Sequence, residues 1–171
     1  MVSTEVKASR SRPILFKGEM VRAILGGAKT QTRRIVHLKM TDKPCPYGVA
    51  GDTLWVRETF CEINGKLIYR ATAPKDFIKP GCWQRSIFMP REACRLELKI
   101  LDTWVEPLNS ISEEDAIAEG IVKLQIPTLC RRDQVFDNAI EAFKMLWEKI
   151  NGAGSWEKNP MVWVIEFEVI K

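Results

Sequence analysis

The sequence is poor in the residues that most often hold metal ions. His37 is the single histidine among 171 residues, and no two of the five cysteines are spaced as a CxxC pair. Structural zinc sites use clustered cysteine and histidine ligands, so a zinc site here would have to be assembled from distant residues. We therefore predict no metal and no other cofactor, and free thiols in a reducing cytoplasmic compartment.

Long apolar runs are also missing. No stretch approaches the ~20 apolar residues that span a bilayer, and residues 1–12 are polar and basic, without the apolar segment of a secretory signal. Internal repeats, low-complexity tracts and heptad arrays are absent from the sequence. We therefore predict no membrane partner, a flexible basic arm over residues 1–12 and a single domain over residues 13–171.

The net charge of +4 hides an uneven distribution. Residues 1–40 hold nine basic residues against two acidic ones, residues 41–100 hold ten against seven, and residues 101–171 hold seven against thirteen. A basic face can attract phosphate-bearing partners. The alternative is that the opposite charges pair across the fold. The small total argues against a protein that coats nucleic acid by charge alone.

Hydrophobic patterning predicts several strands and few helices. The predicted strands cover residues 13–16, 30–36, 53–60, 93–105 and 161–170, and the predicted helices cover residues 19–25, 113–119 and 134–150. Asn64-Gly65 predicts a hairpin turn. Because strands and helices do not alternate regularly, the pattern favours an α+β fold, with a small mixed or antiparallel β-barrel and flanking helices.

Residues 26–34, Gly-Gly-Ala-Lys-Thr-Gln-Thr-Arg-Arg, form the most informative segment and directly follow the first predicted helix. Two glycines suit a helix end that turns through the left-handed conformation. The lysine, hydroxyls and arginines that follow supply donors, cations and a potential nucleophile, as a site for an anionic or nucleotide-like ligand requires. The alternative is a solvated basic strand after an ordinary helix end.

Four motifs along the chain together resemble the ASCH domain of the PUA-like superfamily. The first is Gly27-x-Lys29-x-x-x-x-Arg34, which matches the GxKxxxxR signature. The others are Gly-Asp-x-Leu-Trp-Val at 51–56, Glu-Asp-Ala-x-x-Glu-Gly at 114–120 and Trp-Val-Ile-Glu-Phe at 163–167. The runs at 45–58 and 86–91 are similar to those of stand-alone ASCH proteins of bacteriophages and prophages. The resemblance implies a PUA-like barrel whose cleft takes RNA, single-stranded nucleic acid or a modified nucleoside.

One branch of this family consists of amidohydrolases that remove the acetyl group from N4-acetylcytidine. Its catalytic residues correspond to Lys29, Thr32 and Glu119 of this sequence. Many family members have glutamate in the place of Thr32, so the threonine points toward the hydrolytic branch. The chain is longer than those small enzymes, mainly in residues 37–50, 72–92 and 121–160, and these insertions bear on which substrate fits.

The chemistry of such a triad is plausible, but several roles stay open. A threonine hydroxyl needs a base, and Glu119 could be that base or could activate a water molecule instead. A charged Lys29 would stabilise developing negative charge, whereas burial or neighbouring arginines would lower its pKa and let it act as the base. The alternatives are a surface ion pair of Lys29 with Glu119 and a Thr32 chosen for β-propensity.

Further side chains are predicted to contact the ligand. The predicted phosphate contacts are Arg33, Arg34, Arg85 and Arg91. Trp83 and Tyr47 lie in predicted loops, where bases could stack on their rings. Trp55, Arg57 and Glu58 are also predicted to bind the ligand. Arg57 and Glu58 lie at the end of the strand that holds Trp55, and they could reach a cleft or could pair with neighbouring residues.

Three functions are compatible with these residues. The favoured one is a nucleic-acid or modified-nucleoside binding ASCH domain with a cleft built around Lys29, Thr32, Arg34 and Glu119. The alternatives are an amidohydrolase that deacylates N4-acetylcytidine-type nucleosides, and a phage protein-interaction component with an inactive cleft. The first two require that the segment at Lys29 and the helix end at Glu119 line one cavity.

Overall fold

The computed structural model describes residues 9–37, 44–74, 77, 81–121 and 138–171. The elements are β1 (Ser11–Leu15), α1 (Gly18–Leu25), β2 (Gln31–Ile35), β3 (Thr53–Arg57), β4 (Phe60–Ile63), β5 (Lys66–Tyr69), the 3-10 turns η2 (Ser86–Phe88) and η3 (Arg91–Ala93), β6 (Glu97–Pro107), the 3-10 turn η4 (Leu108–Ser110), α2 (Glu113–Ala118), α3 (Ala139–Asn151) and β7 (Met161–Val169). None of the helices in these ranges is long and apolar enough to cross a membrane.

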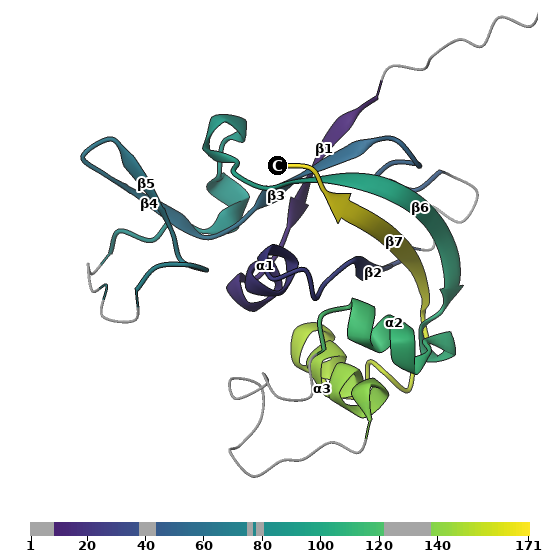
Figure 1. Ribbon diagram of the computed structural model, residues 1–171. Helices are drawn as coiled ribbons and strands as arrows, with labels where there is room; N and C mark the ends of the chain where they lie inside the picture. The colour runs from purple at the N-terminus through teal and green to yellow at the C-terminus, as the bar shows by residue number, and fades with distance from the viewer. Residues whose placement is uncertain (1–8, 38–43, 75–76, 78–80, 122–137) are drawn as a thin grey trace, which may run out of the picture.

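Five strands form one mixed sheet in the order β1-β3-β6-β7-β2. β1 and β3 are parallel, and the other neighbours are antiparallel. Figure 1 shows β6 and β7 sweeping together through a strong bend, and their register shifts between Ile100 and Asp102. The bend brings the edge strands β1 and β2 toward each other. The side chain of Arg34 on β2 reaches β1 and donates to the carbonyl of Leu15 at 2.9 Å. The predicted α+β fold with a mixed sheet is confirmed.

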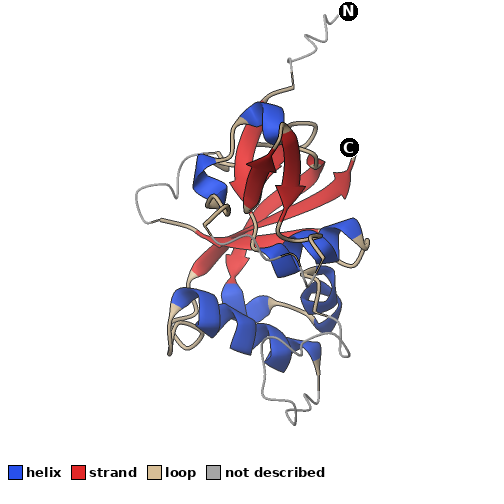
Figure 2. Ribbon diagram, turned by 90° about the vertical axis from the view of Figure 1, so that its left-hand side faces the viewer, coloured by secondary structure: helices blue, strands red, loops and turns tan. Residues whose placement is uncertain are grey.

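α2 and α3 lie together at one end of this sheet, as Figure 1 and Figure 2 show. α2 begins with a capping box between Ser112 and Asp115. α2 also fixes the start of α3, since the Glu113 carboxylate accepts from the main-chain N–H of Ala139 at 2.6 Å. Asn138 caps α3 by accepting from Glu141 N. Residues 134–137 of the predicted helix lie outside the described residues.

β4 and β5 form a separate two-stranded sheet. Asn64 and Gly65 connect them with φ angles of 52° and 73°. Two consecutive positive φ angles are typical of a type I′ turn, so the predicted hairpin is confirmed.

The predicted strand boundaries differ most from the structure at β1, β3 and β6. Residues 53–60 do not form one strand, because β3 ends at Arg57 and β4 begins at Phe60. Glu58, between the two strands, has a buried side chain that pairs with Arg95. The strand predicted from residue 93 begins at Glu97, since Ala93 lies in η3. β1 begins at Ser11, inside the predicted basic arm, of which residues 1–8 lie outside the described residues.

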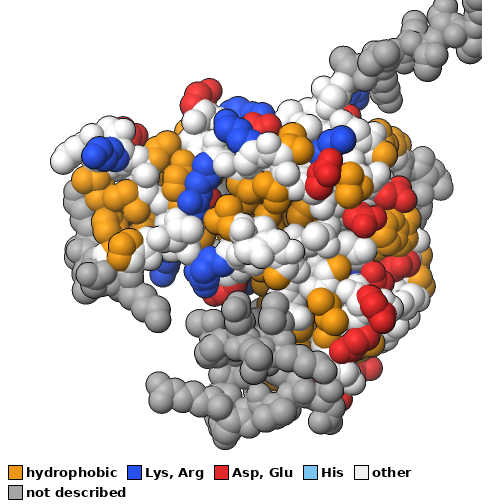
Figure 3. Space-filling model, viewed as in Figure 1, with side chains coloured by type: hydrophobic (Ala, Val, Ile, Leu, Met, Phe, Trp, Pro, Cys, Tyr) orange, Lys and Arg blue, Asp and Glu red, His pale blue; other side chains and the backbone are white. Residues whose placement is uncertain are grey.

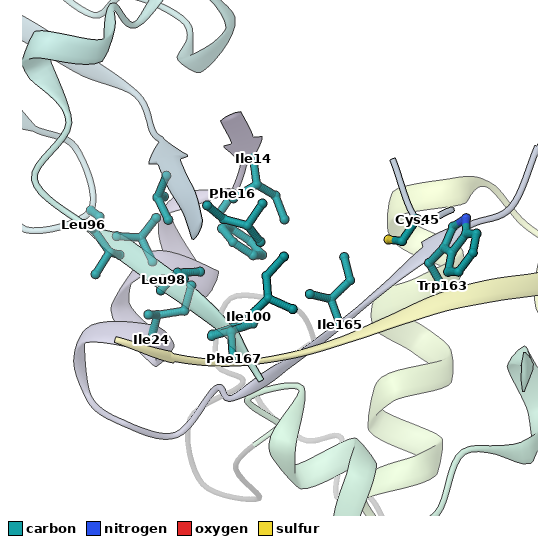
Figure 4. Close-up of a cluster of buried hydrophobic side chains, with 14 residues drawn as sticks. Ile14, Phe16, Ile24, Cys45, Leu96, Leu98, Ile100, Trp163, Ile165 and Phe167 are labelled. Atoms are coloured by element: carbon teal, nitrogen blue, oxygen red, sulfur yellow. The ribbon is translucent and has the colours of Figure 1, made fainter. Parts of the chain in front are cut away.

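The main core lies inside the curve of the sheet. Figure 4 shows Ile14 of β1, Leu98 and Ile100 of β6, and Ile165 and Phe167 of β7 gathered in one cluster. A second cluster covers the opposite face of β7 and is built largely from α3. Its members include Phe143, Leu146, Trp147, Val162 and Val164. β7 is therefore buried on both faces, which is why its sequence is a nearly continuous apolar run.

Candidate functional site

The segment after α1 is joined to the end of α2 by main-chain hydrogen bonds. α1 ends at Gly26 and Gly27, and Gly27 has a φ of 72°, as the paired glycines predict. Lys29 then forms an isolated antiparallel bridge with Glu119, and Thr30 N donates to the carbonyl of Ala118 at 2.8 Å. The backbone itself therefore holds these two distant segments side by side.

Gly120 allows this close approach. It has a φ of 90°, and a Cβ added there would lie 3.0 Å from Ala23 Cβ and 3.1 Å from Lys29 Cβ. Any other residue at this position would meet both the unfavourable backbone angle and the two side chains. The Glu-Gly end of α2 is thus a packing requirement of the site.

The Lys29 ammonium group is buried and fully engaged. Its Nζ donates to the Glu119 carboxylate at 2.6 Å, to the Gln31 carbonyl at 2.7 Å and to the Glu119 carbonyl at 3.0 Å. Burial lowers the pKa of Lys29, and the charge of Glu119 opposes this shift. The side chains of Lys29 and Glu119 are 1% and 6% exposed, so the alternative of a surface ion pair is wrong.

Arg33 holds the second oxygen of Glu119. Its buried guanidinium lies 3.5 Å from Glu119 Oε1, 3.1 Å from Asp115 Oδ2 and 2.8 Å from Glu106 Oε1. Trp104 Nε1 donates to the other Glu106 oxygen at 2.9 Å. The structure thus places Arg33, which we predicted as a phosphate contact, among three carboxylates. The sequence analysis missed Glu106 and Asp115, and no local pattern pairs them with Arg33.

Two cavities lie beside this buried cluster. The larger, of about 430 Å³, is lined by Phe16, Lys29 and Arg34 among others. The smaller, of about 260 Å³, is lined by Arg34, Glu119 and Tyr47 among others. Both are also lined by Met20, Leu146 and Ile150. Lys29 therefore borders one hollow and Glu119 the other, with Arg34 common to both.

Arg34 lies between these cavities with part of its hydrogen-bonding capacity unused. Its guanidinium lies 5.2 Å from the centre of the Phe16 ring, and Lys29 Nζ lies 5.8 Å from the same ring. Nη2 donates to the Leu15 carbonyl. The Nε atom is buried, and in the described part of the chain it has no hydrogen-bond partner. A buried donor without a partner is costly, which makes this atom a natural contact for a ligand.

Thr32 is placed differently from the other two residues of the predicted triad. It is buried on β2 and paired with Ile165 of β7. Because successive residues of a strand face opposite sides, Thr32 and Arg33 lie on opposite faces of β2. Thr32 does not line either of the two cavities. Its hydroxyl is not among the atoms that bind Lys29 Nζ or the Glu119 carboxylate within the described ranges. The structure therefore joins Lys29 and Glu119 directly but leaves Thr32 outside that contact.

Several predicted ligand contacts lie on a second part of the surface. Trp55 has the guanidinium groups of Arg57 and Arg91 over its ring, at 5.2 and 5.5 Å. Arg91 also pairs with Glu97 at 2.9 Å. Glu58 is buried and accepts from Arg95 at 2.8 and 3.0 Å. Its carboxylate is thus occupied by a neighbouring residue, the alternative that the sequence left open.

The remaining aromatic and basic candidates lie near η2. Trp83 packs edge-on against Phe77, with Arg70 6.0 Å from its ring centre. Arg85 lies 5.3 Å from the ring centre of Phe88. Ser86 follows Arg85 and lines the larger cavity, so η2 borders that cavity.

Among the described residues, no three His, Cys, Asp or Glu side chains are grouped to hold a metal ion. Cys45, Cys61, Cys82 and Cys94 are not joined in disulfide bonds among the described residues, and Cys130 lies outside the described ranges. The arrangement offers hydrogen-bond donors, cations and a buried carboxylate as its chemical groups.

Comparison with known proteins finds similarity in structure only. No family model and no curated protein matches the sequence. The crystal structure of an ASCH domain from Lactobacillus crispatus JV V101 aligns with a TM-score of 0.50 at 11% identity, over 94% of this chain and 79% of that one. A DUF984 protein from Enterococcus faecalis V583 aligns with a TM-score of 0.49 at 12% identity, over 96% and 82%. The alignment with the Lactobacillus crispatus domain shows the fold, and this is the fold that the motifs predict.

Proposed function

We propose that this chain, which has the fold of an ASCH domain, binds the nucleobase of an RNA, a single-stranded nucleic acid or a modified nucleoside in the larger of the two cavities at Arg34. The observation that carries the proposal is the position of Arg34, which lines both cavities and has a buried Nε without a partner among the described residues. A base presents ring nitrogens and carbonyl oxygens that can accept from such a donor.

The larger cavity suits a base in size and chemistry. Its volume of about 430 Å³ falls within the ~300–1,000 Å³ range of small-molecule sites. Phe16, Met20 and Leu146 supply apolar walls, while Arg34 and Lys29 supply positive charge. A planar ring gains contact area against such walls, and a few polar groups fix its orientation.

Binding measurements with one charge-neutralising variant test this proposal. Nucleosides, single-stranded RNA and single-stranded DNA are titrated at low salt by calorimetry or fluorescence. We expect Arg34→Gln to weaken binding about 10-fold, because a charge-assisted hydrogen bond is lost. Lys99→Gln is the control, since Lys99 lies on β6 in an exposed pair with Glu168. An Arg34→Gln protein that binds as the wild type does, or a wild type that binds none of the probes, contradicts the proposal.

A second candidate, the amidohydrolase, is favoured by the environment of Lys29. A lysine with a lowered pKa, 2.6 Å from a carboxylate that Arg33 also holds, resembles an acid–base pair more than a structural ion pair. Either Lys29 or Glu119 would take the proton, and the nucleophile would be the Thr32 hydroxyl or a water molecule. The absence of a direct contact between Thr32 and this pair in the described structure favours water.

Turnover of N4-acetylcytidine tests the second candidate. Chromatography should detect released cytidine with the wild type and none with Lys29→Ala or Glu119→Ala. Thr32→Ala distinguishes the two nucleophiles, because only a threonine nucleophile is lost with the hydroxyl. Glu114→Ala is the control, since Glu114 is an exposed residue of the same helix. A wild type without turnover of several N4-acylated cytosines excludes this activity.

We also retain as proposals the phage or prophage origin and the cytoplasmic location. The first is supported by the motifs at 45–58 and 86–91, and the second by the reduced state of the described cysteines, which form no disulfide with one another.

A further inference from the structure

A third cavity adjoins the larger one and has a different character. It measures about 370 Å³ and is lined by Lys17, Arg22, Arg70 and Glu19, together with Thr59. Three cations and one carboxylate give this small space a net positive charge. Lys17, Glu19 and Thr59 also line the larger cavity, so the two spaces are neighbours that share part of their walls.

Within the described part of the chain, the cations of this third cavity are not paired with carboxylates. Arg22 Nη1 donates to the main-chain carbonyl of Ala71 at 3.1 Å, and Arg70 lies against the ring of Trp83. Within the described ranges, Lys17, Arg22 and Arg70 form no ion pair with a carboxylate. The contrast with Arg33 and Arg95, whose guanidinium groups are bound by carboxylates, is clear. Arginines that keep their charge available in a concave site are suited to phosphate.

The backbone around the cavity holds these side chains in place. Arg70 N donates to the Thr59 carbonyl at 2.9 Å, which ties the start of the loop after β5 to the segment between β3 and β4. The start of α1 lies close to Ala71, since a Cβ added to Gly18 would be in ordinary contact with Ala71 Cα at 3.7 Å. α1, β5 and the β3–β4 connection thus converge on one small space.

Charged side chains are unevenly distributed over the surface around this cavity. In Figure 3, Lys and Arg side chains gather on the side that holds α1, β3, β4 and β5, while Asp and Glu side chains gather along the opposite edge, over β6 and β7. An anionic ligand would therefore be drawn toward the side on which the third cavity lies.

We propose that the third cavity binds the phosphate group of the nucleotide whose base occupies the larger cavity. The ligand is then a nucleotide rather than a free nucleoside. This inference rests on the proposed base-binding function, and it adds the class of ligand. The phosphate can belong to a free mononucleotide or to an RNA strand, since both present the same anion to Arg22 and Arg70.

Matched pairs of ligands test the inference. Cytidine and N4-acetylcytidine are each titrated as the nucleoside and as the 5′-monophosphate, alongside a short single-stranded RNA. We expect the phosphate to increase affinity at least about 10-fold, because it adds charge-assisted hydrogen bonds. Preference for the RNA over both mononucleotides would identify a strand as the source of the phosphate, and the reverse would identify a free nucleotide.

A double variant locates the effect. Arg22→Gln with Arg70→Gln should abolish the gain from the phosphate while leaving the affinity for the nucleosides at the wild-type value. For the RNA, the slope of log affinity against log salt should fall by about 0.7 for each lost phosphate contact. The control, Lys66→Gln with Lys99→Gln, removes the same charge from exposed residues of β5 and β6 and should retain the gain.

The failures are distinguishable. Equal affinity for nucleoside and nucleotide, or an equal loss in the control variant, overturns the phosphate site while the base site stands. If none of the probes binds to the wild type, the base site and the phosphate site both fall.

Discussion

Lys29 Nζ binds Glu119 through both the side-chain carboxylate and the main-chain carbonyl, at 2.6 and 3.0 Å. The backbones of the same two residues form a β-bridge, although they lie 90 positions apart in the sequence. Because the main chain sets their separation, neither side chain alone decides whether they meet. Removing the Glu119 carboxylate would leave the buried ammonium with carbonyl acceptors only.

We predict that Glu119→Gln lowers the free energy of unfolding by about 3–5 kcal/mol, because a buried charge loses its counter-charge. Lys29→Met should lower the free energy of unfolding by less than Glu119→Gln does, since Arg33 still faces the Glu119 carboxylate. Urea unfolding followed by tryptophan fluorescence measures both. As a control, Glu168→Gln breaks an exposed pair with Lys99 and should cost at most about 1 kcal/mol. Similar losses for Glu119→Gln and Glu168→Gln would contradict the buried pair.

The pH dependence of stability should carry the signature of Lys29. Burial lowers the pKa of Lys29 in the folded chain below the ordinary value of 10.5, which applies to the unfolded chain. Between the folded pKa and 10.5, the unfolded chain therefore binds a proton that the folded chain does not. The free energy of unfolding therefore gains from Lys29 as pH rises across this window, by up to about 1.4 kcal/mol per pH unit. The difference between wild type and Lys29→Met, measured in urea up to pH 10.5, should grow with pH. A difference that is constant with pH would show that the pKa is not lowered.

Two glycines near the start of β3 should respond very differently to alanine. A Cβ on Gly48, with φ 131°, would lie 2.8 Å from Arg12 Nη1 and 2.9 Å from Asp52 Oδ2, whereas a Cβ on Gly51, with φ 88°, meets nothing within 4 Å. Gly51→Ala should cost about 1–2 kcal/mol for the backbone angle alone. Gly48→Ala should cost about 1–3 kcal/mol more through overpacking. Urea unfolding of the two variants gives the comparison, and equal losses would exclude a role for the close contacts.

The ion pair between Arg95 and Glu58 should depend on the planar shape of the guanidinium group as well as on its charge. Arg95 donates from two nitrogens to the two oxygens of the buried carboxylate and lies 4.0 Å from the centre of the Tyr69 ring. Arg95→Gln should lower the free energy of unfolding by about 3 kcal/mol or more. Arg95→Lys keeps the charge but loses the paired hydrogen bonds, so we expect an intermediate value in the same urea assay. A lysine variant as stable as wild type would show that charge alone suffices.

Elements that depend on neighbours in the sequence were predictable. The Asn64-Gly65 turn was predicted from a local pattern, and the structure confirms it. The cap at Ser112 and the apolar face of α3 also follow from residues that are close together in the sequence. The break after Arg57 was not predictable, because it depends on Glu58 turning inward to a residue on a distant segment. Alternation of side chains in a strand says which residues share a face and gives no information on what lies opposite.

The candidate site shows the same division. Local sequence identified the glycines and cations after α1, and the family motifs linked Lys29 to Glu119. The carboxylates of Glu106 and Asp115 around Arg33 come from β6 and α2, and only the folded sheet brings them together. The three cations of the third cavity were also missed, since Lys17, Arg22 and Arg70 belong to no common motif.

The separateness of the β4–β5 hairpin makes it the natural attachment point for a reporter. Its strands pair with each other and stand apart from the larger sheet in Figure 1, and both residues of the Asn64-Gly65 tip are exposed. A dye or an epitope grafted at this tip would leave the register of the five-stranded sheet unchanged. The hairpin therefore offers a place for immobilising or labelling the protein away from the two cavities at Arg34, which no residue of β4 or β5 lines.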